Sequence, residues 1–142
     1  SLTEKEIQAI ADDRTNNMDN YIVYPDAKEV LEVLSHSYKL GIISDTWPSI
    51  ERQLCTIGVR DYFSTTTYSC ELGKFKPDEA LYEDALRKSG CKPEETVFID
   101  DSVRNLEGAA KLGITPILIA ANAASDVESP YLKIHTLSEL LI

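Results

Sequence analysis

The chain of 142 residues has no apolar run near the roughly 20 residues that a membrane-spanning helix needs, and no basic-then-apolar leader opens it. Basic residues are scarce, because 14 Lys and Arg stand against 24 Asp and Glu, for a formal net charge of −10. Nucleic acids and anionic membranes bind clustered basic surfaces, so we expect neither as a partner. Only three cysteines occur, without C-x-x-C spacing, which predicts reduced thiols in a cytoplasmic protein.

What the sequence does contain is typical of a soluble globular domain. Hydrophobic residues make up 43% of the chain and charged residues 27%, near the averages for such proteins. A single domain of this length buries enough surface to fold without a disulfide or a structural metal. No internal repeat interrupts it, and the small, polar stretch at residues 121–130 is predicted to be a surface loop.

Short apolar or β-branched runs alternate along the chain with segments whose apolar residues recur at a helical period. The runs are typical of strands and fall at residues 40–44, 62–69, 96–99, 114–120 and 133–135. The helical segments between them fall at residues 27–34, 50–57, 77–89 and 102–112. Strict alternation of strands and helices predicts an α/β fold, with helices on both faces of a Rossmann-like parallel sheet.

Two helix starts near the amino end of the chain carry capping signatures. Thr3 and Glu6 have the spacing of a capping box, and the apolar residues behind them predict one long amphipathic helix from Thr3 to about Tyr21. Asp26, with Glu29 three residues on, has the same signature and predicts the start of the next helix.

Several polar residues fall where predicted strands end. Ser44 ends one predicted strand, and Lys76 lies in the loop before a predicted helix. Asp100 and Asp101 directly follow another predicted strand. In a parallel sheet the carboxyl ends of the strands form the edge at which ligands bind. Two adjacent carboxylates suit a divalent cation, and a hydroxyl with an ammonium suits phosphate oxygens, so the sequence predicts metal-assisted phosphate chemistry there.

Each of these residues also has a purely structural interpretation. Ser44 suits a turn or a helix cap, and Lys76 with Asp78 suits a solvated turn that leads into a helix. Asp101 or Ser102 suits the cap of the helix that follows them. Only the joint placement of the polar residues at strand ends favours a functional site over these separate roles.

Residues 24–119 resemble the core of the haloacid dehalogenase-like hydrolase superfamily, most of whose members are magnesium-dependent phosphatases. IISD at residues 42–45 is similar to the second motif of that family, an apolar strand that ends in Ser or Thr. GKFKPD at residues 73–78 is similar to the region of its third motif. VFIDDSVRN at residues 97–105 is similar to its fourth motif, and residues 134–140 resemble its closing strand and helix.

The resemblance implies a role for each candidate residue. Ser44 and Lys76, rather than Lys74, are the implied phosphate-binding and catalytic residues. Asp101 is the implied direct ligand of Mg²⁺, and Asp100 is implied to bind the metal either directly or through a water molecule. The resemblance also implies the substrate, a small phosphorylated metabolite that is a phosphate monoester.

The sequence departs from the family in its nucleophile. In the family the nucleophile is the first Asp of an Asp-x-Asp motif, at the end of the first core strand, whereas no two aspartates here are spaced i, i+2. Asp12 and Asp13 do not substitute, because they lie within a helical pattern. We therefore expect residues 1–22 to be the remnant of a helical cap and residues 23–142 to be a core that lacks its first central strand.

Two functional hypotheses follow from this departure. The first is the carboxyl-terminal portion of a magnesium-dependent phosphohydrolase, which is inactive by itself because no aspartyl-phosphate can form without the nucleophile. The second is a degenerate, non-catalytic member of the family that binds phosphate, metal or a protein partner without turnover.

The family also places its first core strand between the strands that here end at Ser44 and Asp100. Without it, each of these two strands would expose unpaired backbone groups, a state that proteins avoid. Two alternatives stay open. Either the two strands pair directly with each other, or a second copy of the chain fills the space in a strand-exchanged homodimer.

Asp45 stands where the family commonly has Asn. The safer interpretation is that Asp45 faces away from the site and caps the helix that begins at Pro48, and the alternative is a site that tolerates its charge with help from a metal. Trp47, the only tryptophan, lies close enough in sequence to roof the site, although a ring that is exposed or packed against a cap is the expected arrangement.

Overall fold

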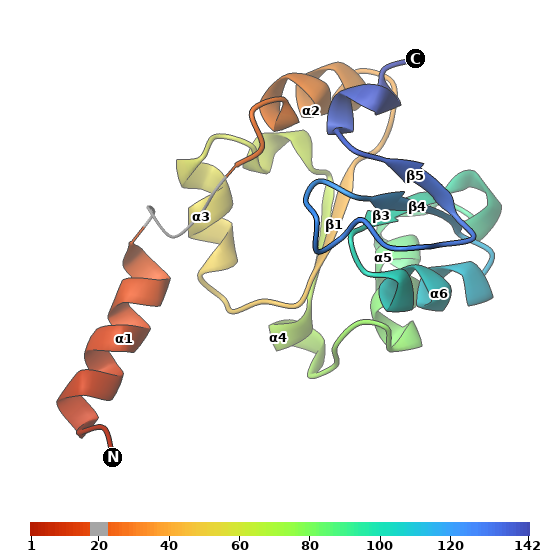
Figure 1. Cartoon of the computed structure of the whole chain (residues 1–142). Helices are drawn as coiled ribbons and strands as arrows, with labels where there is room; N and C mark the ends of the chain where they lie inside the picture. The colour runs from red at the N-terminus through yellow and green to blue at the C-terminus, as the bar shows by residue number, and fades with distance from the viewer. Residues whose placement is uncertain (18–22) are drawn as a thin grey trace.

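The computed structural model describes residues 1–17 and 23–142, in which helices and short strands alternate (Figure 1). Its α-helices are α1 (Glu4–Asn16), α2 (Ala27–Ser35), α3 (Ile50–Thr56), α4 (Ser69–Leu72), α5 (Glu79–Ser89) and α6 (Val103–Lys111). Its strands are β1 (Gly41–Ser44), β2 (Thr65–Tyr68), β3 (Val97–Asp100), β4 (Thr115–Ile119) and β5 (Leu132–Ile134). Short 3₁₀ turns are η2 (Arg60–Tyr62), η3 (Pro93–Glu95) and η4 (Leu137–Leu140). Within the described residues no helix has the length and hydrophobicity needed to cross a membrane.

All strand pairs are parallel, which confirms the predicted α/β class, but the strands form two sheets rather than one. β1 pairs with β2 in one sheet, and β3, β4 and β5 follow one another in the other. Within the described residues no strand lies between β1 and β3, and these two strands do not pair with each other. The alternative in which they pair directly is therefore wrong for the single chain.

Two helices on one face hold the sheets together. α5 packs on β1 and β2, α6 packs on β3 and β4, and the two helices contact each other. Tyr82 of α5 is fully buried in a cluster with Ala109 and Ile114. Ile43 of β1 and Phe98 of β3 both pack against this cluster, and the Tyr82 and Phe98 rings meet edge-on with centroids 5.3 Å apart. The two sheets thus share one apolar core.

The capping box predicted for α1 is confirmed, because Thr3 and Glu6 each accept a hydrogen bond from the other's backbone N–H. α1 is shorter than predicted, because Asn17 has an extended backbone and ends the helix, and residues 18–21 of the predicted helix lie outside the described residues. α1 buries none of its residues and projects from the body of the molecule (Figure 1). Arg52 of α3 joins it to the body by donating hydrogen bonds at 2.8 Å to groups in its last turn.

α2 begins directly after Asp26, which confirms the predicted helix start, but the Asp26 side chain makes no capping hydrogen bond. Its carboxylate instead accepts hydrogen bonds from the backbone N–H and the hydroxyl of Ser138, at 2.9 and 2.8 Å. These bonds join the start of α2 to η4, near the carboxyl end of the chain, a contact that a local sequence signature does not report.

Candidate functional site

Lys76 connects the carboxyl ends of β1 and β3. Its backbone N–H donates to Asp45 Oδ1 at 3.0 Å, directly after β1, and its ammonium lies 2.6 Å from Asp100 Oδ2, at the end of β3. The Lys76 side chain is 13% exposed and the Asp100 side chain 7%, so their ion pair is shielded from water. The ammonium also lies 5.8 Å from the centre of the Phe98 ring, within cation–π range. One residue thus links the two sheets at this edge.

Both oxygens of the Asp100 carboxylate are engaged. Oδ2 pairs with Lys76, while Oδ1 accepts from the backbone N–H of Ser102 at 2.9 Å and from Asn105 Nδ2 at 3.0 Å. These donors offset the cost of burying the carboxylate and join the end of β3 to the start of α6. Asp101, in contrast, is exposed and hydrogen-bonds no group within the described residues.

Ser44 is the last residue of β1, and its hydroxyl has no hydrogen-bond partner within the described part of the chain. In the loop that follows, the N–H of Thr46 donates to the Ser69 hydroxyl at 2.8 Å, which joins this loop to the start of α4. Asp45, next to Ser44, accepts the hydrogen bond from the Lys76 backbone. Ser44 and Lys76 therefore lie at the same edge of the strands.

The phenol of Tyr82 lies beneath this edge. Burial, together with the negative charges of Asp100 and Asp45, raises the pKa of Tyr82 to about 12. Its hydroxyl donates to the backbone carbonyl of Asn105 at 2.8 Å. The phenol therefore stays protonated, and it supports the edge by holding α5 against α6.

Asp100 and Asp101 are the candidate magnesium ligands at this edge. Within residues 1–17 and 23–142, no three His, Cys, Asp or Glu side chains are grouped so that they could bind a metal. Asp100 shares its oxygens with Lys76 and two N–H donors, whereas the Asp101 carboxylate is free of such contacts. Mg²⁺ prefers carboxylate, phosphate and water oxygens, so the chemistry of these acids is suitable. A complete magnesium site would need further oxygen ligands.

The structural interpretations of the candidate residues have different outcomes. Asp78 does cap α5, because its carboxylate accepts an N–H from the first turn at 3.0 Å. Lys76 is not part of a solvated turn, since its side chain is largely buried. Ser102 stands at the N-cap of α6 without a side-chain capping bond. Asp45 binds the Lys76 backbone, and its interpretation as the cap of the helix after Pro48 is wrong.

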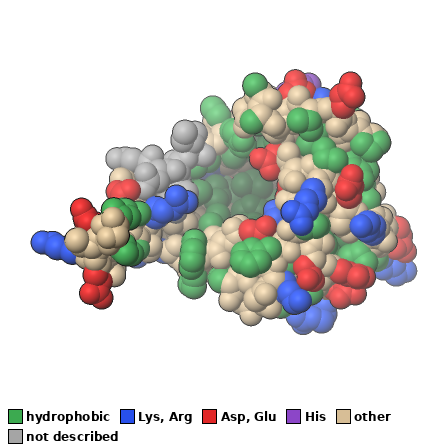
Figure 2. Space-filling model, turned by 60° about the horizontal axis from the view of Figure 1, so that its bottom comes forward, with side chains coloured by type: hydrophobic (Ala, Val, Ile, Leu, Met, Phe, Trp, Pro, Cys, Tyr) green, Lys and Arg blue, Asp and Glu red, His purple; other side chains and the backbone are tan. Residues whose placement is uncertain are grey.

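The carboxyl edge surrounds a hollow in the surface. β1 and β2 run toward the bottom of Figure 1, and Figure 2 views the molecule from that side. A hollow with hydrophobic side chains on its floor is visible there (Figure 2). β1 and β3, which each have an edge without a partner within the described residues, keep apolar residues half-buried, namely Ile42, Ile43, Phe98 and Ile99. Strands of a parallel sheet that are covered on both faces bury such residues fully, so these strands are incompletely covered within the described residues.

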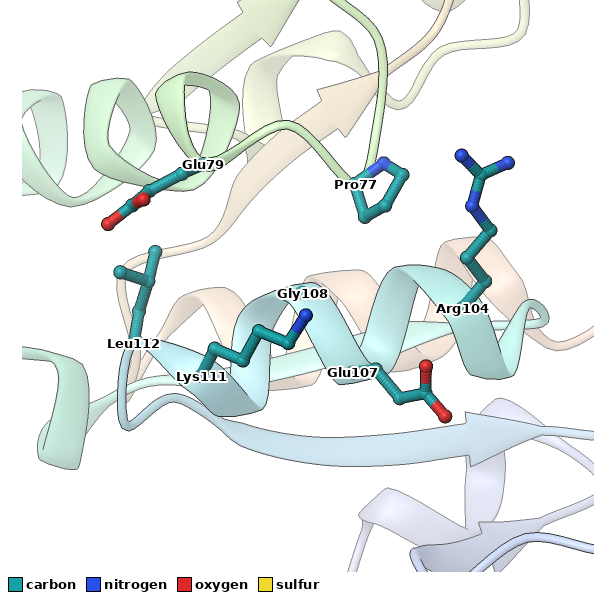
Figure 3. A pocket seen from close by; sticks show the side chains of 7 residues that line it. All are labelled: Pro77, Glu79, Arg104, Glu107, Gly108, Lys111 and Leu112. Atoms are coloured by element: carbon teal, nitrogen blue, oxygen red, sulfur yellow. The ribbon is translucent and has the colours of Figure 1, made fainter.

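A separate pocket of about 550 Å³ lies between the start of α5 and α6 (Figure 3). Arg104, Glu107 and Lys111 project from α6 beside it, and all three are exposed. α6 lies close to α5 and the loop before it here, since a Cβ at Gly108 would lie only 3.0 Å from the Tyr82 ring and 2.7 Å from the Pro77 Cβ. The pocket contains none of the candidate residues, so it is not part of the candidate site.

A parallel α/β fold with polar groups at the carboxyl ends of its strands is common to a large class of enzymes and ligand-binding proteins. Within that class, residues 2–119 match the haloacid dehalogenase-like hydrolase family. The chain therefore belongs to the haloacid dehalogenase-like hydrolases, as its motifs predict.

Relatives and solved structures agree with this assignment. A glyceraldehyde 3-phosphate phosphatase of Methanothermobacter thermautotrophicus is 31% identical over 96 residues, 63% of this chain and 41% of the relative. A phosphoserine phosphatase of Thermus thermophilus is 29% identical over 127 residues, 86% of this chain and 51% of the relative. A HAD phosphatase of Thermococcus onnurineus superposes with a TM-score of 0.80 at 27% identity, over 99% of this chain and 63% of that one. The chain spans about half the length of the curated relatives it matches.

Sequence reasoning assigned no role to Asn105 or Tyr82, although both support the edge. Asn105 lies in the first turn of α6, and side chains of a helix lean toward its amino end, here toward Asp100. Its position four residues after Asp101 is therefore a usable signal. Tyr82 offered none, because its contacts with Phe98 and Asn105 depend on how the two helices pack.

Proposed function

We propose that this chain is the phosphate-binding part of a phosphohydrolase that acts on a small phosphate monoester. The proposal rests on Lys76, whose backbone binds Asp45 after β1 and whose ammonium binds Asp100 after β3. The relatives named as glyceraldehyde 3-phosphate phosphatase and phosphoserine phosphatase favour a small phosphorylated metabolite as the substrate.

In this proposal Ser44 and Lys76 bind the phosphoryl group. The Ser44 hydroxyl, free of other partners within the described residues, donates a hydrogen bond to a phosphoryl oxygen. The Lys76 ammonium, held at the edge by Asp100, balances the charge of the phosphate. Mg²⁺, the implied cofactor, would bind Asp101 and Asp100 together with oxygen ligands from outside the described residues.

The proposed reaction also needs a nucleophile. No Asp-x-Asp pair occurs in the sequence, and no base within the described residues contacts the Ser44 hydroxyl to activate it. The unpaired edges of β1 and β3 would accept an extended segment whose carboxyl end reaches Ser44 and Lys76. We propose that such a strand, in a longer form of the protein, supplies the nucleophilic carboxylate, with residues 1–22 belonging to a cap and residues 23–142 to the core.

A second candidate is a non-catalytic binding module. The absence of a nucleophile favours it, as does the absence of a three-ligand metal group within residues 1–17 and 23–142. Both candidates bind phosphate at Ser44 and Lys76. They differ in whether a longer form of the protein hydrolyses a phosphate monoester.

Calorimetric titration with inorganic phosphate tests the shared site. We expect Ser44→Ala to weaken phosphate binding about tenfold, the effect of losing one hydrogen bond to a charged group. The matched control is Lys74→Met, two residues from Lys76 in the same loop, where the side chain is 58% exposed and lies 3.5 Å from Asp78. Phosphate affinity in this variant should stay within about twofold of the parent chain.

The titration also has results that would overturn the proposal. If Ser44→Ala binds phosphate as tightly as the parent chain, the phosphate site is elsewhere. If the parent chain binds no phosphate, the described edge is not a phosphate site by itself. Thermal unfolding of Ser44→Ala checks that any loss comes from the site, since its hydroxyl supports no other contact within the described residues.

A further inference from the structure

Two large aromatic side chains are unusually exposed next to the candidate phosphate site. Trp47 is 75% exposed and Phe75 is 67% exposed, although burying a side chain of this size contributes about 1.5–3 kcal/mol. Both lie outside the core cluster around Tyr82. Exposed aromatic groups of this kind are typical of surfaces that bind a ligand or a partner.

The two rings belong to loops that meet at the site. Trp47 is two residues after Asp45, and Phe75 is the residue directly before Lys76. The hydrogen bond from the Lys76 N–H to Asp45 Oδ1, at 3.0 Å, fixes these loops against each other. Figure 2 shows hydrophobic side chains at the mouth of the hollow on this face as well as on its floor.

The loops also carry few charges that would attract an anionic group. Asp45 is exposed on the first loop. Lys74, on the second, lies 3.5 Å from the carboxylate of Asp78, and the Lys76 ammonium, which also contacts Asp100, is the group proposed to bind the phosphoryl oxygens. A ligand whose organic part carried its own carboxylate would meet the charge of Asp45 without a free cation on these loops to balance it.

We propose that Trp47 and Phe75 select phosphate monoesters whose organic group is uncharged and apolar or aromatic. The phosphoryl group lies at Ser44 and Lys76, and the organic group packs against the two rings at the rim. This inference rests on the proposed phosphate site and adds to it the residues that determine the substrate class.

Non-hydrolysable phosphonates test the inference on the chain as it stands. Methylphosphonate, phenylphosphonate and phosphonoacetate share the phosphorus group and differ in the group attached to it. We expect phenylphosphonate to bind about tenfold more tightly than methylphosphonate, from stacking on aromatic rings, and phosphonoacetate to bind more weakly than methylphosphonate. Because Trp47 is the only tryptophan, its fluorescence should also change with phenylphosphonate and change much less with methylphosphonate.

Two substitutions test whether the rings at the rim cause the preference for phenylphosphonate. Phe75→Ala should reduce the ratio of phenylphosphonate to methylphosphonate affinity from about ten to about two. Tyr38→Ala is the matched control, because Tyr38 is 66% exposed but precedes β1, at the opposite end of the strand from Ser44. This variant should keep the full ratio.

The outcomes separate the two proposals. If methylphosphonate binding does not depend on Ser44, the proposed phosphate site is wrong and the inference falls with it. If methylphosphonate binding depends on Ser44 but phenylphosphonate binds no more tightly, the phosphate site stands and the aromatic selection is wrong. An equal loss of ratio in Phe75→Ala and Tyr38→Ala also overturns the inference.

Discussion

β1 and β3 are less buried than β2 and β4, the strands that pair with them. β2 buries Thr67 and Tyr68, and β4 buries Ile117 and Leu118, each to 8% exposure or less. β1 buries none of its four residues, and β3 buries only Asp100. β4, which has a strand on each side, is buried as the middle strands of a parallel sheet usually are.

This difference indicates where the chain has apolar surface to spare. β4 has a strand on each side, while β1 and β3 each have an edge without a partner within the described residues. Open edges with apolar side chains are the surfaces at which another strand adds the most burial and the most hydrogen bonds. Both open edges end at the candidate site. A strand that paired with them would therefore also reach that site.

The largest expected effect is on molecular mass. With direct pairing of β1 and β3 excluded for the single chain, we propose that a second copy covers these edges in a strand-exchanged homodimer. Size-exclusion chromatography with light scattering should give twice the mass of the chain at high concentration and a monomer on dilution. A strictly monomeric chain at every concentration would rule out the exchange.

Truncating a side chain should lower the free energy of unfolding more on β4, which has a strand on each side, than on β1, which has an edge without a partner within the described residues. Leu118→Ala removes a fully buried side chain of β4 and should lower the free energy of unfolding by about 4 kcal/mol. Ile42→Ala, on β1, removes a half-buried side chain and should cost about 1 kcal/mol. Urea unfolding of the dilute monomer measures both, and equal costs would show that β1 is buried as deeply as β4.

The ion pair between Lys76 and Asp100 should contribute more to the free energy of unfolding than the exposed charges near it. Lys76→Met leaves the Asp100 carboxylate, 7% exposed, without its cation, and we expect a loss of about 3 kcal/mol in urea unfolding. Lys74→Met removes an exposed charge from the same loop and should cost less than about 0.5 kcal/mol. Similar losses in the two variants would contradict the bridging role of Lys76.

A smaller effect on stability should come from Asp84 of α5, whose partners lie on α5 and β2. Burial acts to raise the pKa of Asp84, but hydrogen bonds from Lys88, Thr67 and Arg87 outweigh it, so the pKa is below the ordinary value of 3.8. Because the folded state binds the ionised form better, Asp84 stabilises the fold above about pH 3.8, and this contribution is lost as the pH falls through the lowered pKa. Asp84→Asn should flatten the acid limb of stability against pH. An unchanged acid limb would contradict this assignment.

Local signals in the sequence predicted most of the elements and the ends of the strands. The apolar run before Ser44 and the run before Asp100 lie within one residue of β1 and β3, because alternating apolar runs and turn residues act locally. Contacts between distant segments were not predictable in this way. The bond between Lys76 and Asp45 and the ion pair between Lys76 and Asp100 depend on how the two sheets are placed.

The split into two sheets was also beyond the local pattern. The apolar sequence of β1, with Ile42 and Ile43 side by side, is that of a strand buried on both faces of a sheet. The apolar pattern therefore indicates a strand suited to the buried interior of a sheet. It does not report whether a neighbour is present within the described residues.

We propose that this edge binds phosphate but that the chain lacks the carboxylate that would attack it. The most direct measurement is hydrolysis of nitrophenyl phosphate by the purified 142-residue chain at millimolar Mg²⁺. We predict release of nitrophenol no faster than in buffer with Mg²⁺ alone. Turnover that requires Mg²⁺ and is lost in Ser44→Ala would contradict the account, because the chain would then carry its own nucleophile.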